Sequence, residues 1–231
     1  MAGNRRGTLA ALPLLQGVAE PVCAAAVDAA QYRTLDPGTV IFSEADPAAT
    51  FFVLLSGSLK LVQLTEDGDA VVFRLLGRGD AFGTVSVLGE GVYPVSAIAV
   101  TRVSVAQWPA AMMRGFLEQD PRLSLNVLRS VSDRLQALRL QYRQLATEHV
   151  ESRVARALLK LVQRAGTRVD EGVLLDLPLS REDVAQLTGT TVFTISRIVS
   201  RWEAAGILRA GRQRLVVRQP NALAAIADDI S

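Results

Sequence analysis

The side chains best suited to bind a polyanion gather in the last third of the chain. Residues 149–218 contain 12 Arg and Lys against 7 Asp and Glu, whereas residues 1–148 contain 13 against 14. The whole chain carries a formal net charge of only +2, so the excess of positive over negative charge lies in this one segment. Such a segment is typical of a nucleic-acid-binding surface, although a solvated basic face is the commoner origin of the pattern.

Arg197 is the residue that we expect to read a base directly. It lies one turn into a predicted helix over residues 192–205 and points outward. Its planar guanidinium can donate two hydrogen bonds to O6 and N7 of a guanine, a contact worth about 1–3 kcal/mol of discrimination. The opposite face of the same helix is predicted to be buried and consists of Val192, Ile195, Ile198, Val199 and Trp202.

Other side chains near this helix are candidates for contacts with phosphates or base edges. Hydroxyl groups at a helix N-terminus and exposed arginines suit phosphates, which set register and salt dependence more than sequence preference. Ser196 can bond a base edge or a phosphate. For Arg201 and the arginines that follow, a solvated surface is the alternative. The predicted DNA-contacting residues are Ser180, Thr190, Thr191, Phe193, Ser196, Arg197, Arg201, Arg212 and Arg214.

The elements that carry these residues begin with two predicted helices. Ser180 and Asp183 resemble a capping box, which predicts a short helix over residues 181–187. A tight turn follows, in which Gly189 can adopt the left-handed conformation, and it leads into the helix over residues 192–205. The candidate N-caps of this second helix are Thr190 and Thr191.

A β-hairpin is predicted over residues 207–217, after Gly206 stops the second helix. Two helices joined by a tight turn and followed by a hairpin form a winged helix-turn-helix, whose second helix enters the major groove of DNA. The arginines of this wing suit phosphates: Arg209, Arg212, Arg214 and Arg218.

The middle of the chain is predicted to be a β-barrel. From residue 39 to residue 107, short runs of Val, Ile, Phe and Leu alternate with breaks that contain glycine. Gly57, Gly68 and Gly79 recur every 11 residues, which matches a strand and a tight turn repeated. Many short strands at this spacing indicate an antiparallel barrel or jelly roll.

A long helix is predicted after the barrel. Asp120 can cap it, Pro121 suits its first position, and no Gly or Pro interrupts residues 122–165. Its apolar residues recur at spacings of 3 and 4, a seam that pairs with a second helix, and we favour a parallel homodimer over a helix packed on its own barrel. The residues around His149 are predicted to be a hinge. The predicted dimer interface comprises Leu128, Val131, Leu135, Leu138, Tyr142 and Leu145.

These elements define an α+β chain with three parts. We expect an effector-sensing β jelly roll at residues 1–119, a dimerisation helix at 120–148, and a winged helix-turn-helix at 149–231. The Ala-rich segment 9–30 predicts one or two short helices, which Pro13 and Pro21 interrupt.

The composition excludes several kinds of chemistry. The one cysteine, Cys23, and the one histidine, His149, cannot supply the ligands of a structural zinc or iron–sulfur site. A Ser-His-Asp set would need His149, and no phosphate-binding glycine motif occurs, so catalysis is not expected. No signal peptide and no apolar run of about 18 residues occurs, so we expect a cytoplasmic protein without a membrane partner.

Together these features resemble the CRP/FNR family of bacterial transcription regulators. Residues 79–83 (GDAFG) are similar to a family segment of the barrel, and residues 191–197 (TVFTISR) resemble the recognition helix of its FNR branch. The resemblance implies a homodimer that binds a two-fold symmetric operator in double-stranded DNA and contacts RNA polymerase. The alternative is an effector-binding module that acts on a protein partner without DNA, against which the basic winged helix argues.

Departures from the family pattern affect both binding sites. Family members carry Glu, an acceptor for cytosine N4, where this chain has Phe193, which can pack on a thymine methyl. The cyclic-AMP activators place Glu after the barrel glycine and an Arg-Ser pair further on, whereas this chain has Thr84 and Val95. Without that arginine a cyclic phosphate loses its partner, so cyclic AMP is not expected. The effector-pocket positions are Phe82, Gly83, Thr84, Val85, Val95, Ser96, Leu138 and Arg139.

The effector itself is left open by the sequence. The iron–sulfur cluster of FNR needs cysteines that this chain lacks. The remaining resemblance is to members with apolar pockets, such as the nitric-oxide and haem-linked regulators of denitrification. Three alternatives remain: haem, an unidentified small molecule, or activity controlled by expression level alone. Axial ligands for a haem would be His149, Cys23, Met112, Met113 or a tyrosine.

Overall fold

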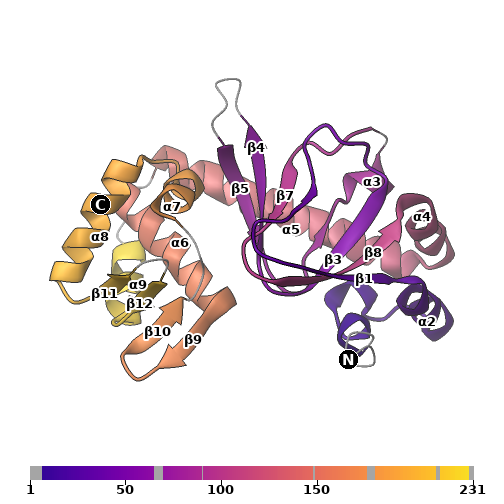
Figure 1. Cartoon of the computed structure of the whole chain (residues 1–231), viewed down its shortest axis with the longest axis horizontal. Helices are drawn as coiled ribbons and strands as arrows, with labels where there is room; N and C mark the ends of the chain where they lie inside the picture. The colour runs from indigo at the N-terminus through magenta and orange to yellow at the C-terminus, as the bar shows by residue number, and fades with distance from the viewer. Residues whose placement is uncertain are drawn as a thin grey trace. The chain divides into compact units, whose positions relative to one another are not determined.

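The chain folds into two compact units, which are described separately (Figure 1). The computed structural model describes residues 7–64, 70–89, 91–147, 149–175, 180–211 and 214–228. The first unit contains residues 1–70 and 74–136, and the second contains residues 71–73 and 137–231. None of the described helices has both the length and the apolar composition needed to cross a bilayer.

The first unit contains two four-stranded antiparallel sheets, as the glycine-punctuated pattern predicts. Gly57 and Gly79 have φ angles of 83° and 90°, the left-handed conformation expected at these turns, and Gly68 lies outside the described residues. One sheet has the order β1 (Gln31–Leu35), β8 (Val103–Pro109), β3 (Thr50–Ser56), β6 (Ala81–Phe82). The other has the order β2 (Val40–Phe42), β7 (Ser96–Ala99), β4 (Leu59–Leu64), β5 (Ala70–Leu76).

Strand β3 is buried on both faces. Phe52 and Leu54 belong to the core between the two sheets, whereas Phe51, Val53 and Leu55 belong to a second core on the outer face. The sequence FFVLL has no polar alternation because neither face of this strand meets solvent. The β-sandwich is therefore fixed at its centre by one continuously apolar strand.

Helices cover the outer face of the sheet that contains β3. They contribute the second core, together with Trp108, whose Nε1 donates to the Ala26 carbonyl oxygen at 2.8 Å. The prediction that Pro21 interrupts a helix is wrong. Pro21 lies in the first turn of α2, where a missing N–H costs nothing. The described helical elements are η1 (Pro13–Leu15), α2 (Glu20–Ala29), α3 (Val85–Leu88), α4 (Ala110–Gln119) and α5 (Pro121–Thr147).

Asp120 caps α5, as the sequence predicts. Its Oδ1 accepts from the backbone N–H groups of Arg122 at 2.7 Å and Leu123 at 3.3 Å. Its Oδ2 accepts from the N–H of Ala19 at 2.8 Å. These hydrogen bonds lower the pKa of the buried Asp120 carboxyl because they favour its charged form, and the bond from Ala19 has the largest effect.

The second unit is a winged helix-turn-helix with one hairpin that the sequence did not reveal. The predicted break falls at His149, the N-cap of α6. The wing is one half of a four-stranded antiparallel sheet of order β11-β12-β10-β9, and the hairpin of β9 and β10 was not predicted. The elements are α6 (Val150–Ala165), β9 (Gly166–Val169), β10 (Gly172–Leu175), α7 (Arg181–Thr188), α8 (Val192–Ala204), β11 (Leu208–Gly211), β12 (Arg214–Val217) and α9 (Pro220–Asp228).

Candidate nucleic-acid interface

A complete capping box starts α7. The Ser180 Oγ accepts from the Asp183 N–H at 3.0 Å, and Asp183 Oδ2 accepts from the Ser180 N–H at 2.9 Å. The Ser180 hydroxyl also donates to Asp183 Oδ2 at 2.8 Å. The predicted capping box is therefore confirmed, with the shorter Asp in place of Glu. Because the Ser180 hydroxyl already donates its proton to Asp183, it is not free to donate to a phosphate while this cap is intact.

The turn between α7 and α8 has the geometry expected of a helix-turn-helix. Gly189 adopts the left-handed conformation, with φ 61° and ψ 48°. The Thr190 N–H donates to the Ala185 carbonyl at 2.9 Å. Of the two candidate caps it is Thr191 that caps α8, since its Oγ1 accepts from the Thr194 N–H at 3.2 Å. The side chain of Thr191 is exposed at the N-terminus of α8.

Helix α8 buries one face and exposes the other. Four of the five predicted core positions are buried: Ile195, Ile198, Val199 and Trp202. The prediction for Val192 is wrong, because this side chain is 44% exposed. Val192 is the first residue after the cap, in the first turn of α8, and the buried face begins only at Ile195.

The exposed face of α8 presents Phe193 and Arg197. The Phe193 side chain is 78% exposed, the highest value among the large apolar residues of the described chain. Arg197 is also exposed, one turn further along. Ser196 is half-buried, and its hydroxyl accepts from Arg181 Nη1 at 3.2 Å. An aromatic ring and a guanidinium one turn apart are thus available to a base edge, with Ser196 partly occupied.

Arg201 is paired within the unit. Its Nη2 lies 2.9 Å from Oε2 of Glu151, at the start of α6. Oε1 of the same carboxylate accepts from Trp202 Nε1 at 2.8 Å. Sequence reasoning missed Glu151, because 51 residues separate it from Trp202 and no local pattern connects them.

The wing arginines divide into two groups. Arg209 and Arg218 both pair with Glu171 of the β9–β10 turn, with N–O distances of 3.0 and 3.2 Å. Arg214 is exposed on β12, near the end of the hairpin where β11 and β12 meet. Arg212 lies outside the described residues. The charge of Arg209 and Arg218 is therefore partly balanced before any polyanion approaches.

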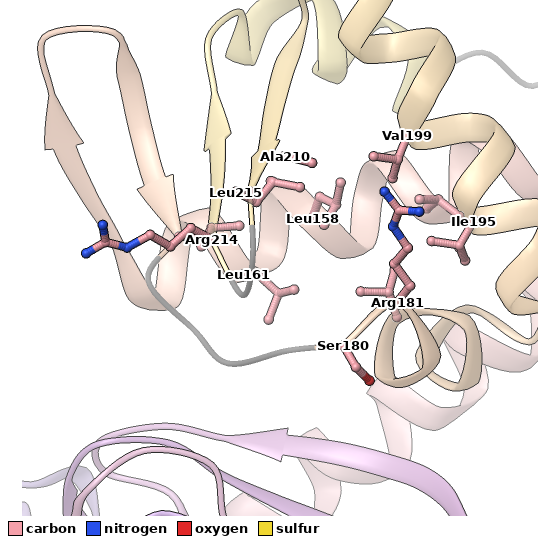
Figure 2. Close-up of a pocket in the computed structure, with 13 residues that line it drawn as sticks. Leu158, Leu161, Ser180, Arg181, Ile195, Val199, Ala210, Arg214 and Leu215 are labelled. Atoms are coloured by element: carbon pink, nitrogen blue, oxygen red, sulfur yellow. The ribbon is translucent and has the colours of Figure 1, made fainter.

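An apolar hollow of about 100 Å³ lies between α6, α7, α8 and the wing (Figure 2). Figure 2 shows Leu158, Leu161, Ile195 and Val199 around it, and the guanidinium of Arg214 pointing away from it. Much of its wall consists of side chains that are buried in the core of the second unit, such as Leu158, Leu161, Ile195 and Val199. The hollow thus belongs to the scaffold that holds α8, and Arg214 projects outside it.

The predicted dimer seam is exposed along α5. Leu128, Leu135, Leu138 and Tyr142 are 53%, 60%, 46% and 75% exposed, and Val131 is half-buried. The side chain of Leu145 lies outside the described set. Another face of α5 makes the intramolecular contacts: its Leu123 and Val127 are fully buried in the core beneath the first sheet.

The effector positions of the first unit lie at the end of an aromatic cluster. Phe82 is fully buried and stacks on Phe52 with ring centroids 4.9 Å apart, while Phe42 stacks on Tyr93 at 3.8 Å. Phe82, Val85 and Val95 pack on this one core. Gly83 has a φ of 67°, and a Cβ there would lie 2.9 Å from the Thr50 carbonyl oxygen.

The remaining effector positions have separate environments. Thr84 is buried, and the Ser96 hydroxyl accepts from the Glu44 N–H at 2.8 Å. Val95, at the position where cyclic-AMP activators carry arginine, packs against the aromatic core, so this position offers no cation to a cyclic phosphate. Leu138 and Arg139 are exposed in the second half of α5, within the second unit.

A half-buried arginine lies close to Phe82. Arg134 of α5 donates from Nη2 to the carbonyl of Ala81 at 3.4 Å, and its buried Nε has no hydrogen-bond partner among the described residues. Nearby, Arg74 Nη2 lies 2.8 Å from Asp80 Oδ1. Burial lowers the pKa of the Arg134 guanidinium, and the positive charge of Arg74 lowers it further. Two arginines here face one carboxylate.

The candidate haem ligands are scattered. His149 is exposed at the N-terminus of α6, Cys23 is half-buried on α2, and burial raises the pKa of its thiol. Met113 is buried in the outer core, while its neighbour Met112 is 43% exposed. Within the part of the chain that the structure describes, no three His, Cys, Asp or Glu side chains are grouped as a metal site would need.

Comparisons with protein families match both units. Residues 32–120 match the cyclic nucleotide-binding domain, and residues 152–226 match the Crp-like helix-turn-helix domain. The chain is 26% identical over 216 residues to a CRP-like cAMP-activated global transcriptional regulator of Mycobacterium tuberculosis, covering 94% of this chain and 96% of the relative. It is 28% identical over 195 residues to a global nitrogen regulator of Synechocystis, covering 83% and 86%.

The fold has a close match among solved structures. The structure of FixK2 from Bradyrhizobium japonicum superposes with a TM-score of 0.75 over 87% of this chain and 99% of that chain. The sequence identity in this alignment is 22%, so the likeness is one of fold. The predicted class, a β-sheet domain followed by a long helix and a helix-turn-helix, is confirmed.

Proposed function

The chain is a DNA-binding transcription regulator of the CRP/FNR family, and from this premise we propose that it reads a palindromic operator through the exposed face of α8. The observation that carries the proposal is that Arg197 and Phe193 are both exposed on one face of a capped helix. Arg197 donates to O6 and N7 of a guanine, and Phe193 packs against a thymine methyl one turn away. Val192, exposed beside it, widens this apolar contact.

Contacts with the DNA backbone complete the interface. The Thr191 cap and the free N–H groups at the start of α8 suit one phosphate, with Thr190 beside them. Arg214 and Arg212 of the wing suit the phosphates that flank the groove. These contacts fix register and salt dependence, whereas the base contacts of α8 set the sequence preference.

A parallel homodimer joined along the α5 seam presents two such helices. Four large apolar side chains on this helix are about half exposed or more, and pairing would remove them from water. Two recognition helices must enter major grooves one helical turn apart, about 34 Å, which makes the operator two-fold symmetric. As a regulator of this family, the bound dimer acts by contacting RNA polymerase.

The test of this function is duplex selection followed by titration. We expect full-length protein to enrich palindromic duplexes from a random library and to bind the enriched duplex more tightly than a scrambled one. Affinity for both must fall steeply with salt, because each phosphate contact contributes a log–log slope of about −0.9. Enrichment of no sequence, with affinity that salt does not change, would overturn DNA reading and favour a module that acts on a protein partner.

We propose that the effector is a small molecule other than cyclic AMP and that it carries an anionic group. Val95 is an apolar residue packed against the aromatic core and offers no cation for a cyclic phosphate, whereas Arg134 keeps a buried Nε without a partner in the described chain. A thermal-shift panel of small carboxylates, phosphates and cyclic AMP tests this. The expected result is stabilisation by a carboxylate or phosphate that Arg134→Met abolishes. Equal stabilisation by cyclic AMP, or none by any compound, would contradict it.

A further inference from the structure

One carboxylate holds two consecutive residues of the recognition helix. Glu151 Oε1 accepts from Trp202 Nε1 at 2.8 Å, and its Oε2 pairs with Arg201 Nη2 at 2.9 Å. The Trp202 ring is buried, while the side chains of Glu151 and Arg201 are 31% and 59% exposed. The last third of α8 is therefore joined to the first turn of α6 by a part-buried hydrogen bond from Trp202 and by an exposed ion pair from Arg201.

A second side chain of the same turn holds the other end of the reading helix. Arg153 donates from Nε to the Thr188 carbonyl at 3.1 Å and from Nη2 to the Gly189 carbonyl at 3.4 Å. A cation there also favours the C-terminal end of α7 through the helix dipole. Glu151 thus contacts α8 near its C-terminal end, and Arg153 contacts the turn that precedes its N-terminal end.

The position of α8 must be held closely for bases to be read. Helix α8 has 13 residues, and at 1.5 Å per residue it is about 20 Å long. A tilt of about 10° around one end moves the other end by about 3 Å, which is as long as a whole hydrogen bond. Phosphate contacts to flexible arginines tolerate such a shift, but a two-bond contact from Arg197 to a guanine does not.

We infer that Glu151 is a positioning residue for operator binding and that Arg201 is a second positioning residue, which acts through its ion pair with Glu151. The carboxylate fixes the angle of α8 against α6 through Trp202 and Arg201. Arg201 then serves the protein scaffold instead of a phosphate, because its guanidinium is already paired across 50 residues of sequence. The inference rests on the proposed reading of DNA by α8 and adds the residues that hold the helix in place.

The test compares two isosteric changes of charge. Glu151→Gln weakens the pair, whereas Glu182→Gln removes the same charge from an exposed α7 residue that has no hydrogen bond or ion pair among the described residues. Fluorescence anisotropy is measured on the selected operator and on a scrambled duplex. We expect Glu151→Gln to weaken operator binding about tenfold and to change scrambled binding less than about twofold. Equal effects of the two variants would overturn the inference.

The salt dependence of DNA binding by an Arg201 variant tests the positioning role of Arg201 separately. Arg201→Gln changes a well-exposed side chain, so the folded unit should survive even where Glu151→Gln does not. We expect weaker operator binding with an unchanged salt slope on scrambled duplex. A slope of log affinity against log salt concentration that is reduced by about 0.9 would instead identify Arg201 as a phosphate ligand and would overturn its positioning role.

Tryptophan fluorescence reports the contact itself. The chain has two tryptophans, so Trp108→Phe leaves Trp202 as the only tryptophan. In that background we expect Glu151→Gln to shift the emission and Glu182→Gln to leave it unchanged; an unshifted spectrum would contradict the contact. Wild-type protein that binds no duplex would overturn the proposed function, whereas wild-type binding with indistinguishable variants would overturn only the positioning role.

Discussion

At the scale of single residues, the reading face of α8 combines one charged and one aromatic group. Arg197 and Phe193 lie one turn apart and are both exposed, while Ser196 between them is occupied by Arg181. Sequence preference should therefore depend on two contacts of different chemistry. A guanidinium selects guanine by direction, and a phenyl ring selects a methyl group by shape.

Replacing Arg197 should change specificity more than affinity for random DNA. We expect Arg197→Ala to lose preference at one G·C pair in each half-site, a loss of about 1–3 kcal/mol of discrimination. Arg214→Ala should weaken all sequences alike and lower the salt slope by about 0.9. Sequencing of selected duplexes measures both effects. A uniform loss across sequences from Arg197→Ala would refute its role as a base reader.

Replacing Phe193 should redirect the base preference beside that guanine. Phe193→Glu puts an acceptor at a position that is 78% exposed, so the fold should be unaffected. We expect selected half-sites to change from a T·A pair to a C·G pair there, because a carboxylate accepts from cytosine N4. Phe193→Leu is the control and should keep the thymine. Selection of the same half-site by Phe193→Glu would show that this residue does not meet a base.

At the scale of elements, short-range signals decide where the helices begin. Asp120 caps α5, Ser180 and Asp183 cap α7, and Thr191 caps α8, each through contacts within three residues. Asp120 differs from the others because it also accepts from Ala19, more than a hundred residues earlier. The cap of α5 thereby fastens α2 to it.

The Asp120 cap should make the stability of the protein depend on pH. Hydrogen bonds lower the pKa of this carboxyl in the folded state, so its stabilisation is complete above the ordinary Asp value of about 4 and is lost as the pH falls through the lowered folded value. Urea unfolding between about pH 2.5 and 6 measures the effect.

The control for this prediction is Asp120→Asn. Its amide oxygen can still accept at the cap, but it does not titrate, so the acid-side loss should be smaller than in wild-type protein. Asp46→Asn, which removes a carboxylate with a single exposed hydrogen bond to the Ser43 N–H, serves as a second comparison. An unchanged pH profile in Asp120→Asn would contradict the assignment.

At the scale of the whole molecule, the seam of α5 should determine the oligomeric state. The helix already buries Leu123 and Val127 within the first unit, so Leu128, Leu135 and Tyr142 remain for another partner. The alternative prediction, a helix that packs on its own barrel through the seam, does not agree with the exposure of Leu128 and Leu135, which belong to the same unit as the barrel. A second copy of the same helix is the partner that the regular spacing favours.

Charging the seam should separate the dimer without unfolding the chain. We expect Leu135→Lys to convert dimers to monomers in sedimentation at micromolar concentration and to lower operator affinity, with little change in thermal unfolding of the monomer. Leu140→Lys is the matched control: Leu140 is 38% exposed on the same helix but lies off the seam. Monomeric wild-type protein, with or without operator, would contradict the dimer.

What the sequence can predict in this chain is the structure that neighbouring residues enforce. The capping box of α7, the left-handed Gly189 and the break at His149 all depend on contacts within one turn. The buried face of α8 also follows from its period, except at Val192 in the first turn, because the period does not show where along the helix burial begins. Hairpin β9–β10 and strand β1 lack a distinctive local pattern, because partner strands far along the chain stabilise them.

The sequence by itself determined the class of the molecule. It predicted a β domain with glycine-containing turns, a long helix with an apolar seam, and a basic winged helix-turn-helix that carries Arg197. The tertiary structure alone decided that Arg201, Arg209 and Arg218 are paired within the protein, because Glu151 and Glu171 reach them across about 40 to 50 residues. The physical reason is range. Helix caps and apolar periods act over three or four residues, whereas a salt bridge forms wherever the fold brings opposite charges within a few ångströms.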